Sequence, residues 1–157
     1  MKRGFTFFGN KLSRKAGEKC CEFGQNGLPL SNEYLQDFFN TASEQMKYWR
    51  LVESNTMITH AWFVTDYLKA VEFMLEVAKL DANNVLKQQP NMYILRKELL
   101  KIELTTPKLK GLSNADLALA VQICLLPQKD YGIIPVMDEK TPRRELRMKQ
   151  TEKMNNS

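Results

Sequence analysis

The sequence contains a single histidine, His60, and this scarcity excludes several familiar kinds of chemistry. With a single imidazole, Ser–His–Asp and Cys–His catalytic groups and multi-histidine metal sites are all hard to build. The three cysteines, Cys20, Cys21 and Cys124, are too few, and odd in number, for a disulfide framework. Cys20 and Cys21 are adjacent, which is not the spacing by which two thiolates bind one zinc ion. We therefore expect no catalytic residue, no metal and no cofactor, and we expect His60 to be a packed core residue.

Motifs for nucleotide phosphates and for export are also absent from the sequence. Neither GxxxxGK[ST] nor GxGxxG occurs. No apolar signal-peptide core lies near the N-terminus, so an intracellular, cytoplasmic location is predicted. The first seventeen residues carry basic and aromatic side chains and no acidic one, a composition shared with organelle transit peptides. Targeting to an organelle remains an alternative.

The most prominent feature that is present is an apolar stretch from Thr56 to Leu80. Its apolar residues recur at alternating steps of four and three, which places them on one face of an α-helix: Met57, Ala61, Val64, Leu68, Val71, Leu75 and Ala78. A second apolar stripe lies beside the first, so the pattern predicts a central core helix covered on several sides. The charged residues left over favour a solvated, salt-bridged edge: Asp66, Lys69, Glu72, Glu76 and Lys79.

A first long helix is predicted from Asn32 to about Glu53, with Ser31 as its N-cap. Because only the break at residues 54–55 separates it from the apolar stretch, the two helices should form an antiparallel hairpin. The predicted fold class is therefore mostly α: a single helical domain built on a long antiparallel helix hairpin.

Shorter elements are expected to pack on this hairpin. Asn91 is predicted to cap a helix that runs to about Leu104. Ser113 and Asp116 have the spacing of a capping box at the start of a nearly all-apolar helix that ends at Leu126. Residues 131–136 are predicted to be extended and could pair with residues 5–8 as a small two-stranded patch. The expected organisation is a basic irregular arm over 1–30, a helical core domain over 31–127, and an extended segment with a basic tail over 128–157.

The formal net charge is +5, and the basic residues concentrate outside the two expected central helices. Basic ends of this kind suit contacts with phosphates, which supply affinity without reading a base sequence. The candidate nucleic-acid-binding residues are Lys2, Arg3, Lys11, Arg14, Lys15, Lys19, Arg96, Lys97, Lys101, Arg143, Arg144, Arg147 and Lys149.

These observations lead to the hypothesis of a non-enzymatic nucleic-acid-binding accessory protein, or a small helical subunit of a nucleoprotein complex. The expected partner is a phosphate backbone or an acidic protein, within a larger complex and away from membranes. A helical adaptor or inhibitor that acts through protein–protein contacts is the alternative. An enzyme with a carboxylate site around Asp66, Glu72 or Glu76 is a third hypothesis, and no string in the sequence is specific enough to identify a family.

Overall fold

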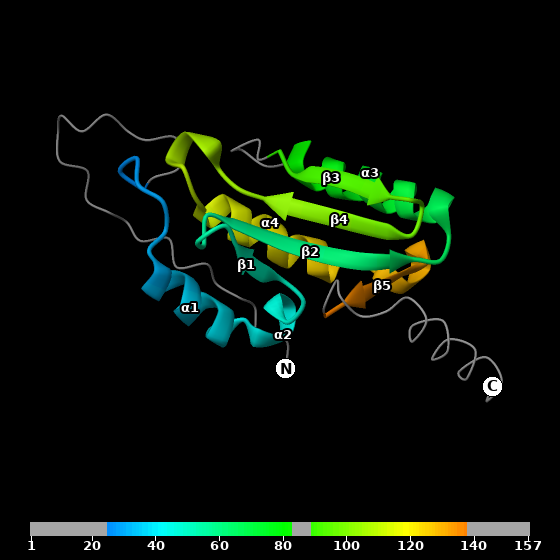
Figure 1. The fold of residues 1–157 in the computed structure, drawn as a ribbon, viewed down its shortest axis with the longest axis horizontal. Coiled ribbons are helices and arrows are strands. Elements are labelled where there is room, and N and C mark those ends of the chain that lie inside the picture. Colours follow the sequence, from blue (N-terminus) through cyan, green and yellow to red (C-terminus); the bar gives the residue numbers. More distant parts are fainter. Residues whose placement is uncertain (1–24, 83–88, 138–157) are drawn as a thin grey trace.

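A five-stranded antiparallel β-sheet forms the centre of the structure, and helices cover one of its faces (Figure 1). The structure is a computed structural model, and it describes residues 25–82 and 89–137. The strands are β1 (Arg50–Val52), β2 (Met57–Val64), β3 (Asn91–Leu95), β4 (Leu99–Leu104) and β5 (Ile133–Val136).

Strand β2 is the centre of this sheet. The strand order is β1-β2-β4-β3, and β5 also pairs with β2. Along one edge β2 bonds to β4, with His60 opposite Ile102; along the other edge it bonds to β1 near its start and to β5 near its end. Every residue from Ile58 to Val64 is buried, because both faces of the strand are covered.

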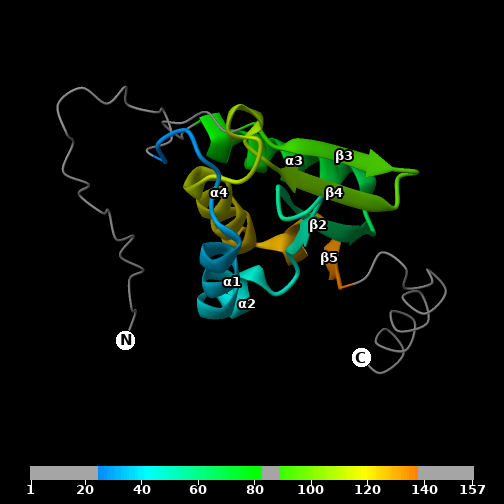
Figure 2. The same ribbon diagram turned by 60° about the vertical axis from the view of Figure 1, so that its left-hand side comes forward.

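The helices are α1 (Asn32–Thr41), α2 (Ser43–Met46), α3 (Tyr67–Ala82) and α4 (Asn114–Leu125), with 3₁₀ turns η1 (Pro107–Leu109) and η2 (Gln128–Tyr131). In Figure 1, α3 and α4 lie behind the sheet, and Figure 2 shows α1 and α2 stacked beside α4. Within the described ranges, no helix has the length and apolar character needed to cross a membrane.

Strand β4 shows how the core is built. Its side chains alternate, so that Leu100, Ile102 and Leu104 are buried towards the helices, while Lys101 and Glu103 lie half-buried on the opposite face. Trp62 and Phe73 pack edge to face in the same core, with ring centroids 5.5 Å apart. A period of two is the signature of a sheet with two different faces.

The predicted helix hairpin is wrong, and with it the mostly α fold class. The stretch expected as one core helix divides at residues 65–66 into strand β2 and helix α3, and the region expected to be helical up to Glu53 already contains strand β1. A short strand that is buried on both faces shows no alternation of polar and apolar residues, so its sequence resembles that of a buried helix. Asp66 marks the actual start of α3, because its carboxylate accepts a hydrogen bond from the Lys69 backbone N–H at 3.2 Å.

The helix predicted over 91–104 is also wrong, because those residues form the β3–β4 hairpin. Leu95 pairs with Leu99, and the connecting turn places Arg96 and Lys97 at φ 50° and 59°. This left-handed conformation is usually adopted by Gly or Asn. The sequence therefore gave no turn signal where the chain reverses.

Three local predictions are confirmed. Ser31 caps α1 by accepting a hydrogen bond from the Tyr34 N–H, and Ser113 and Asp116 form a complete capping box on α4. Part of the segment 131–136 is extended, as strand β5, but it pairs with β2. The partner proposed for it, residues 5–8, lies outside the described residues. The domain boundaries remain predictions.

Two leucine truncations distinguish this fold from the helix hairpin. Leu100→Ala should lower the free energy of unfolding by about 2–5 kcal/mol, because Leu100 is 0% exposed and the truncation leaves a cavity. Leu68→Ala should change it by less than about 0.5 kcal/mol, because Leu68 is 73% exposed on α3. Urea unfolding of both variants measures the difference, and a large loss in Leu68→Ala would contradict the structure.

Candidate functional site

A buried carboxylate, Asp116, organises the junction between β4 and α4. Asp116 is 0% exposed. Its Oδ2 accepts hydrogen bonds from the Thr106 hydroxyl at 2.7 Å, the Ser113 N–H at 2.8 Å and the Ser113 hydroxyl at 3.1 Å. Buried charges are stable only where such partners surround them. The network fixes the first turn of α4 and the end of the β4 segment relative to each other.

Thr106 and Ser113 also fix the loop that connects β4 to α4. The Thr106 N–H donates to the Gly111 carbonyl at 2.8 Å, and the Thr106 hydroxyl lies 2.9 Å from the Ser113 hydroxyl. Lys110, at φ 53°, ends the 3₁₀ turn η1 within this loop. Sequence reasoning found the capping box but assigned no role to Thr106. The hydroxyl of Thr106, ten residues before Asp116 in the sequence, was the missed partner of that carboxylate.

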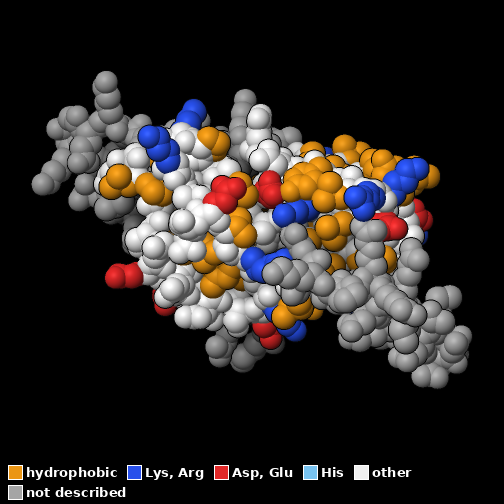
Figure 3. Space-filling model, viewed as in Figure 1, with side chains coloured by type: hydrophobic (Ala, Val, Ile, Leu, Met, Phe, Trp, Pro, Cys, Tyr) orange, Lys and Arg blue, Asp and Glu red, His pale blue; other side chains and the backbone are white. Residues whose placement is uncertain are grey.

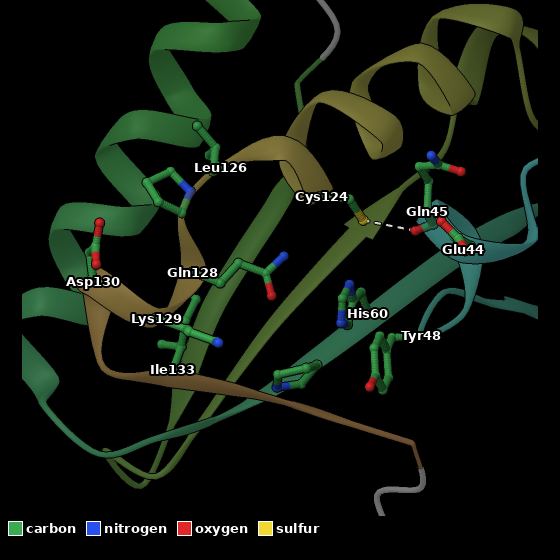
Figure 4. Close-up of a pocket in the computed structure, with 12 residues that line it drawn as sticks. Glu44, Gln45, Tyr48, His60, Cys124, Leu126, Gln128, Lys129, Asp130 and Ile133 are labelled. Atoms are coloured by element: carbon green, nitrogen blue, oxygen red, sulfur yellow. Dashed lines mark hydrogen bonds between the residues drawn. The ribbon is translucent and has the colours of Figure 1, made fainter. Parts of the chain in front are cut away.

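A hollow of about 590 Å³ lies on the other side of the same sheet–helix core, beside η2 and β5. Figure 4 shows the side chains that line it, with Tyr48 and His60 facing Gln128 and Lys129. Most of its wall is apolar, and three exposed charged residues, Glu44, Lys129 and Asp130, also line it. Concave apolar sites with a few polar groups are the usual form of a small-molecule site.

His60 forms the most unusual part of that wall. It is 1% exposed, and among the described residues neither of its ring nitrogens has a hydrogen-bond partner. Its ring stacks on Trp62 at a centroid distance of 3.6 Å and lies parallel to the ring of Tyr48 at 5.8 Å. Burial, together with the charge of Arg50, lowers the pKa of His60 from 6.5 to about 3. The imidazole is therefore neutral at physiological pH.

Cys124 closes one corner of the hollow. Its thiol donates to the Gln45 carbonyl at 2.9 Å, and its sulfur accepts from the Trp49 indole N–H at 3.1 Å. Burial raises the pKa of the thiol, against a smaller opposing effect of the Trp49 hydrogen bond. Cys124 is therefore a protonated packing residue, as its apolar sequence context predicts.

A third polar cluster lies on the face of the sheet opposite the helices. The Tyr93 hydroxyl donates to the Glu103 carboxylate at 2.6 Å, and the Lys101 ammonium lies 3.6 Å from the same oxygen. Burial and the hydrogen bond to Glu103 raise the pKa of Tyr93. Figure 3 shows this face, with charges of both signs scattered among hydrophobic side chains.

The structure brings few of the predicted nucleic-acid-binding residues together. Arg96 and Lys97 lie at the tip of the β3–β4 hairpin, and Lys101 lies on β4 beside Glu103. The others lie outside the described residues: Lys2, Arg3, Lys11, Arg14, Lys15, Lys19, Arg143, Arg144, Arg147 and Lys149. The residue assignments, and a phosphate backbone or acidic protein as partner, stay predictions. Of the carboxylates considered for an enzyme site, Asp66 caps α3 and Glu76 binds Lys79 at 2.6 Å.

The fold is of the α/β class: helices cover one face of an antiparallel sheet. A buried polar junction lies where β4 leads into α4. Residues 29–125 match the family model for pterin 4 alpha carbinolamine dehydratase, and the chain belongs to that family. Among solved structures, the chain is similar to a transcriptional coactivator/pterin dehydratase from Brucella melitensis, with 16% identity and a TM-score of 0.52 over 66% of this chain and 98% of that chain. None of the curated proteins compared with the chain matches it.

The family membership corrects the functional hypothesis. The chain belongs to an enzyme family, so the expectation of a non-enzymatic, all-α nucleic-acid-binding protein is wrong. The matched region runs from just before α1 to the end of α4, and it contains the Asp116 network. It ends at residue 125, before η2 and β5. The hollow beside His60 is therefore built only in part from the region that the family shares.

The burial of His60 predicts a specific dependence of stability on pH. Below pH 6.5 the unfolded chain binds a proton that the folded chain, with a pKa of about 3, does not bind. The free energy of unfolding therefore carries no penalty from His60 above pH 6.5. It falls as the pH drops from 6.5 towards 3, by at most about 1.4 kcal/mol per pH unit.

Comparison with His60→Phe isolates this contribution, because Phe keeps the aromatic ring and cannot bind a proton. Urea unfolding at pH 7 and pH 5 should show the wild type losing about 2 kcal/mol more than the variant. Equal losses in the two proteins would mean that His60 titrates normally in the fold.

Proposed function

We propose that the chain catalyses the dehydration of a pterin carbinolamine. The observation that carries this proposal is the match to the pterin 4 alpha carbinolamine dehydratase family across residues 29–125, which includes the whole sheet except β5 and all four α-helices. The likeness to the Brucella melitensis protein supports the fold that the reaction would use.

Dehydration of a carbinolamine requires that the protein position the substrate and transfer protons. A carbinolamine carries a hydroxyl group and a nitrogen on the same carbon. Its dehydration breaks the C–O bond, delivers one proton to the departing hydroxyl to form water, and removes one proton from nitrogen as the C=N bond forms. The site therefore has to hold the ring, donate one proton and accept another.

Within the family region, we place the substrate beside the β4–α4 junction. The Thr106 hydroxyl there is fixed by Asp116 and Ser113, so it is pre-oriented before any ligand arrives. Asp116 is fully buried and acts as a positioning residue, because it orients Thr106 and the start of α4. Groups held by such a network keep their geometry at little entropic cost.

The only imidazole of the chain is absent from this junction. His60 lies on β2 opposite Ile102, and its side chain lines the hollow beside η2. Proton transfer at the junction therefore uses no histidine. The pH–rate profile should lack an inflection near pH 6.5, the ordinary pKa of an imidazole.

We also propose that the reaction takes place inside the cell, in the cytoplasm. The support is the state of Cys124, a free thiol that burial keeps protonated. Such a thiol persists most readily in a reducing compartment.

Two substitutions of Thr106 test the assignment. Thr106→Val keeps the shape and removes the hydroxyl, and it should lower kcat/KM by about tenfold with most of the loss in kcat. Thr106→Ser keeps the hydroxyl and should restore most of the rate. Stopped-flow absorbance with a freshly generated 4a-hydroxytetrahydropterin measures the dehydration against the uncatalysed reaction.

Thr106→Val should also lower the free energy of unfolding, because it removes a buried hydrogen bond to Asp116, so the rates of the two variants are compared under conditions where both are fully folded. No acceleration by the wild-type chain over buffer would overturn the proposed function. Normal activity in Thr106→Val would leave the reaction but overturn its placement at the β4–α4 junction.

A further inference from the structure

Residues 25–30 lead into α1 and lie against the loop that precedes α4 (Figure 2). The Leu30 N–H donates to the Leu112 carbonyl at 2.9 Å. Pro29 packs so close to Gly111 that a Cβ added to this glycine would lie 2.6 Å from the Pro29 Cβ. The segment is therefore held in place by contacts with residues that are distant in the sequence.

Gln25 attaches the beginning of this segment to the N-terminus of α4. Its side-chain oxygen accepts a hydrogen bond from the Asn114 N–H at 2.9 Å. Its NH₂ group donates to the Leu28 carbonyl at 3.0 Å and to the Leu112 carbonyl at 3.4 Å. Asn114 is the first residue of α4, where backbone N–H groups have no partner within the helix. Gln25 therefore supplies an acceptor that the helix itself lacks.

Next to Gln25 the chain reverses in a tight turn at Asn26 and Gly27. The Leu28 N–H donates to the Gln25 carbonyl at 3.0 Å, and the two central residues have φ values of 54° and 75°. Positive φ at both positions is typical of a type I′ turn, for which Asn-Gly is a preferred sequence. Both residues are exposed, and a Cβ on Gly27 would have no atom within 4 Å beyond its chain neighbours. Water therefore reaches the turn, and no side chain shields the Gly27 nitrogen.

Asn26 belongs to the only Asn-Gly pair of the sequence, and its side chain is not held. Among the described residues, neither the Asn26 side chain nor the Gly27 N–H has a hydrogen-bond partner. By contrast, the Asn55 side chain donates to Asn32 Oδ1 at 3.1 Å, and the residue after it, Thr56, has a branched side chain. The Asn26 amide can therefore bend back onto the next peptide nitrogen, which the Asn55 amide cannot do without losing its partner.

We propose that Asn26 is a site of spontaneous covalent modification, in which it deamidates through a cyclic imide. The Gly27 nitrogen attacks Cγ of Asn26. A Cγ–N bond forms as the Cγ–Nδ2 bond breaks, and the Gly27 proton leaves with Nδ2 as ammonia. Water then opens the imide ring. Opening at Cγ gives aspartate, and opening at the main-chain carbonyl gives isoaspartate, in which the main chain runs through Cγ.

Isoaspartate changes how residues 25–30 are attached to the rest of the chain. It lengthens the main chain by one carbon atom between the Asn26 Cα and the Gly27 nitrogen. The Leu28 N–H and the Gln25 carbonyl then no longer meet in the geometry of the turn, and Gln25 is released from α4. The step uses neither Thr106 nor Asp116, so its test is independent of the proposed dehydration.

Incubation of the folded full chain at neutral pH in H₂¹⁸O tests the chemistry. Digestion in ordinary water, followed by mass spectrometry with electron-transfer fragmentation, should find ¹⁸O at residue 26 and more isoaspartate than aspartate. The label marks conversion that took place in the folded chain. Asn55 is the internal control and should convert at least about tenfold more slowly, because the branched Thr56 side chain crowds the attacking nitrogen. The variant Asn26→Gly keeps a residue that accepts positive φ and has no amide to lose, so it should gain no label there.

Equal conversion of Asn26 and Asn55 would overturn the proposed site. Conversion of Asn26 to aspartate without isoaspartate would overturn the cyclic imide.

Amide hydrogen exchange at Leu30 and Asn114 tests the release of the segment. In the purified isoaspartate form, both amides should exchange about tenfold faster than in the fresh chain, because each loses a hydrogen bond. Freshly prepared Asn26→Asp is the matched control, since it carries the new charge without the extra main-chain carbon, and it should exchange like the wild type. Unchanged exchange in the isoaspartate form, or equal acceleration in Asn26→Asp, would overturn the release.

Discussion

The placement of β2 is the constraint on which the rest of the structure depends. Its backbone bonds to β4 along one edge and to β1 and β5 along the other, and both of its faces are covered. Backbone groups are satisfied in such a position, but polar side chains find few partners. The hydroxyl of Thr59 and both ring nitrogens of His60 are buried without hydrogen bonds among the described residues. The low pKa of His60 is a direct consequence of the same burial.

The same strand pairing separates two regions of different character. Towards the end of β4, the chain enters the Thr106–Asp116 network, which lies inside the region shared with the pterin 4 alpha carbinolamine dehydratase family. Beside His60, residues after 125 add η2 and β5 and enclose a hollow. The residues after 125 lie outside the region that the family model matches, and β2 contacts both parts, because it pairs with β4 on one edge and with β5 on the other.

Sequence reasoning succeeded where the determining contacts are local. The Ser31 cap and the Ser113–Asp116 box were predicted because each depends on residues three apart. It failed for β2, because its partner β4 lies about forty residues later in the chain. The apolar residues of β2 also fit a helical period as well as a strand. Thr106 was missed for a related reason, since it acquires its role only through its contact with Asp116 in the fold.

Amide hydrogen exchange of the folded chain tests the central position of β2 most directly. The amides of residues 59–63 should be among the slowest to exchange and should open only with global unfolding, because the strand is bonded on both edges and covered on both faces. Amides of the edge strand β3 should exchange faster. Fast exchange in β2, or helical contacts between the amides of residues 57–64, would contradict this account of the fold.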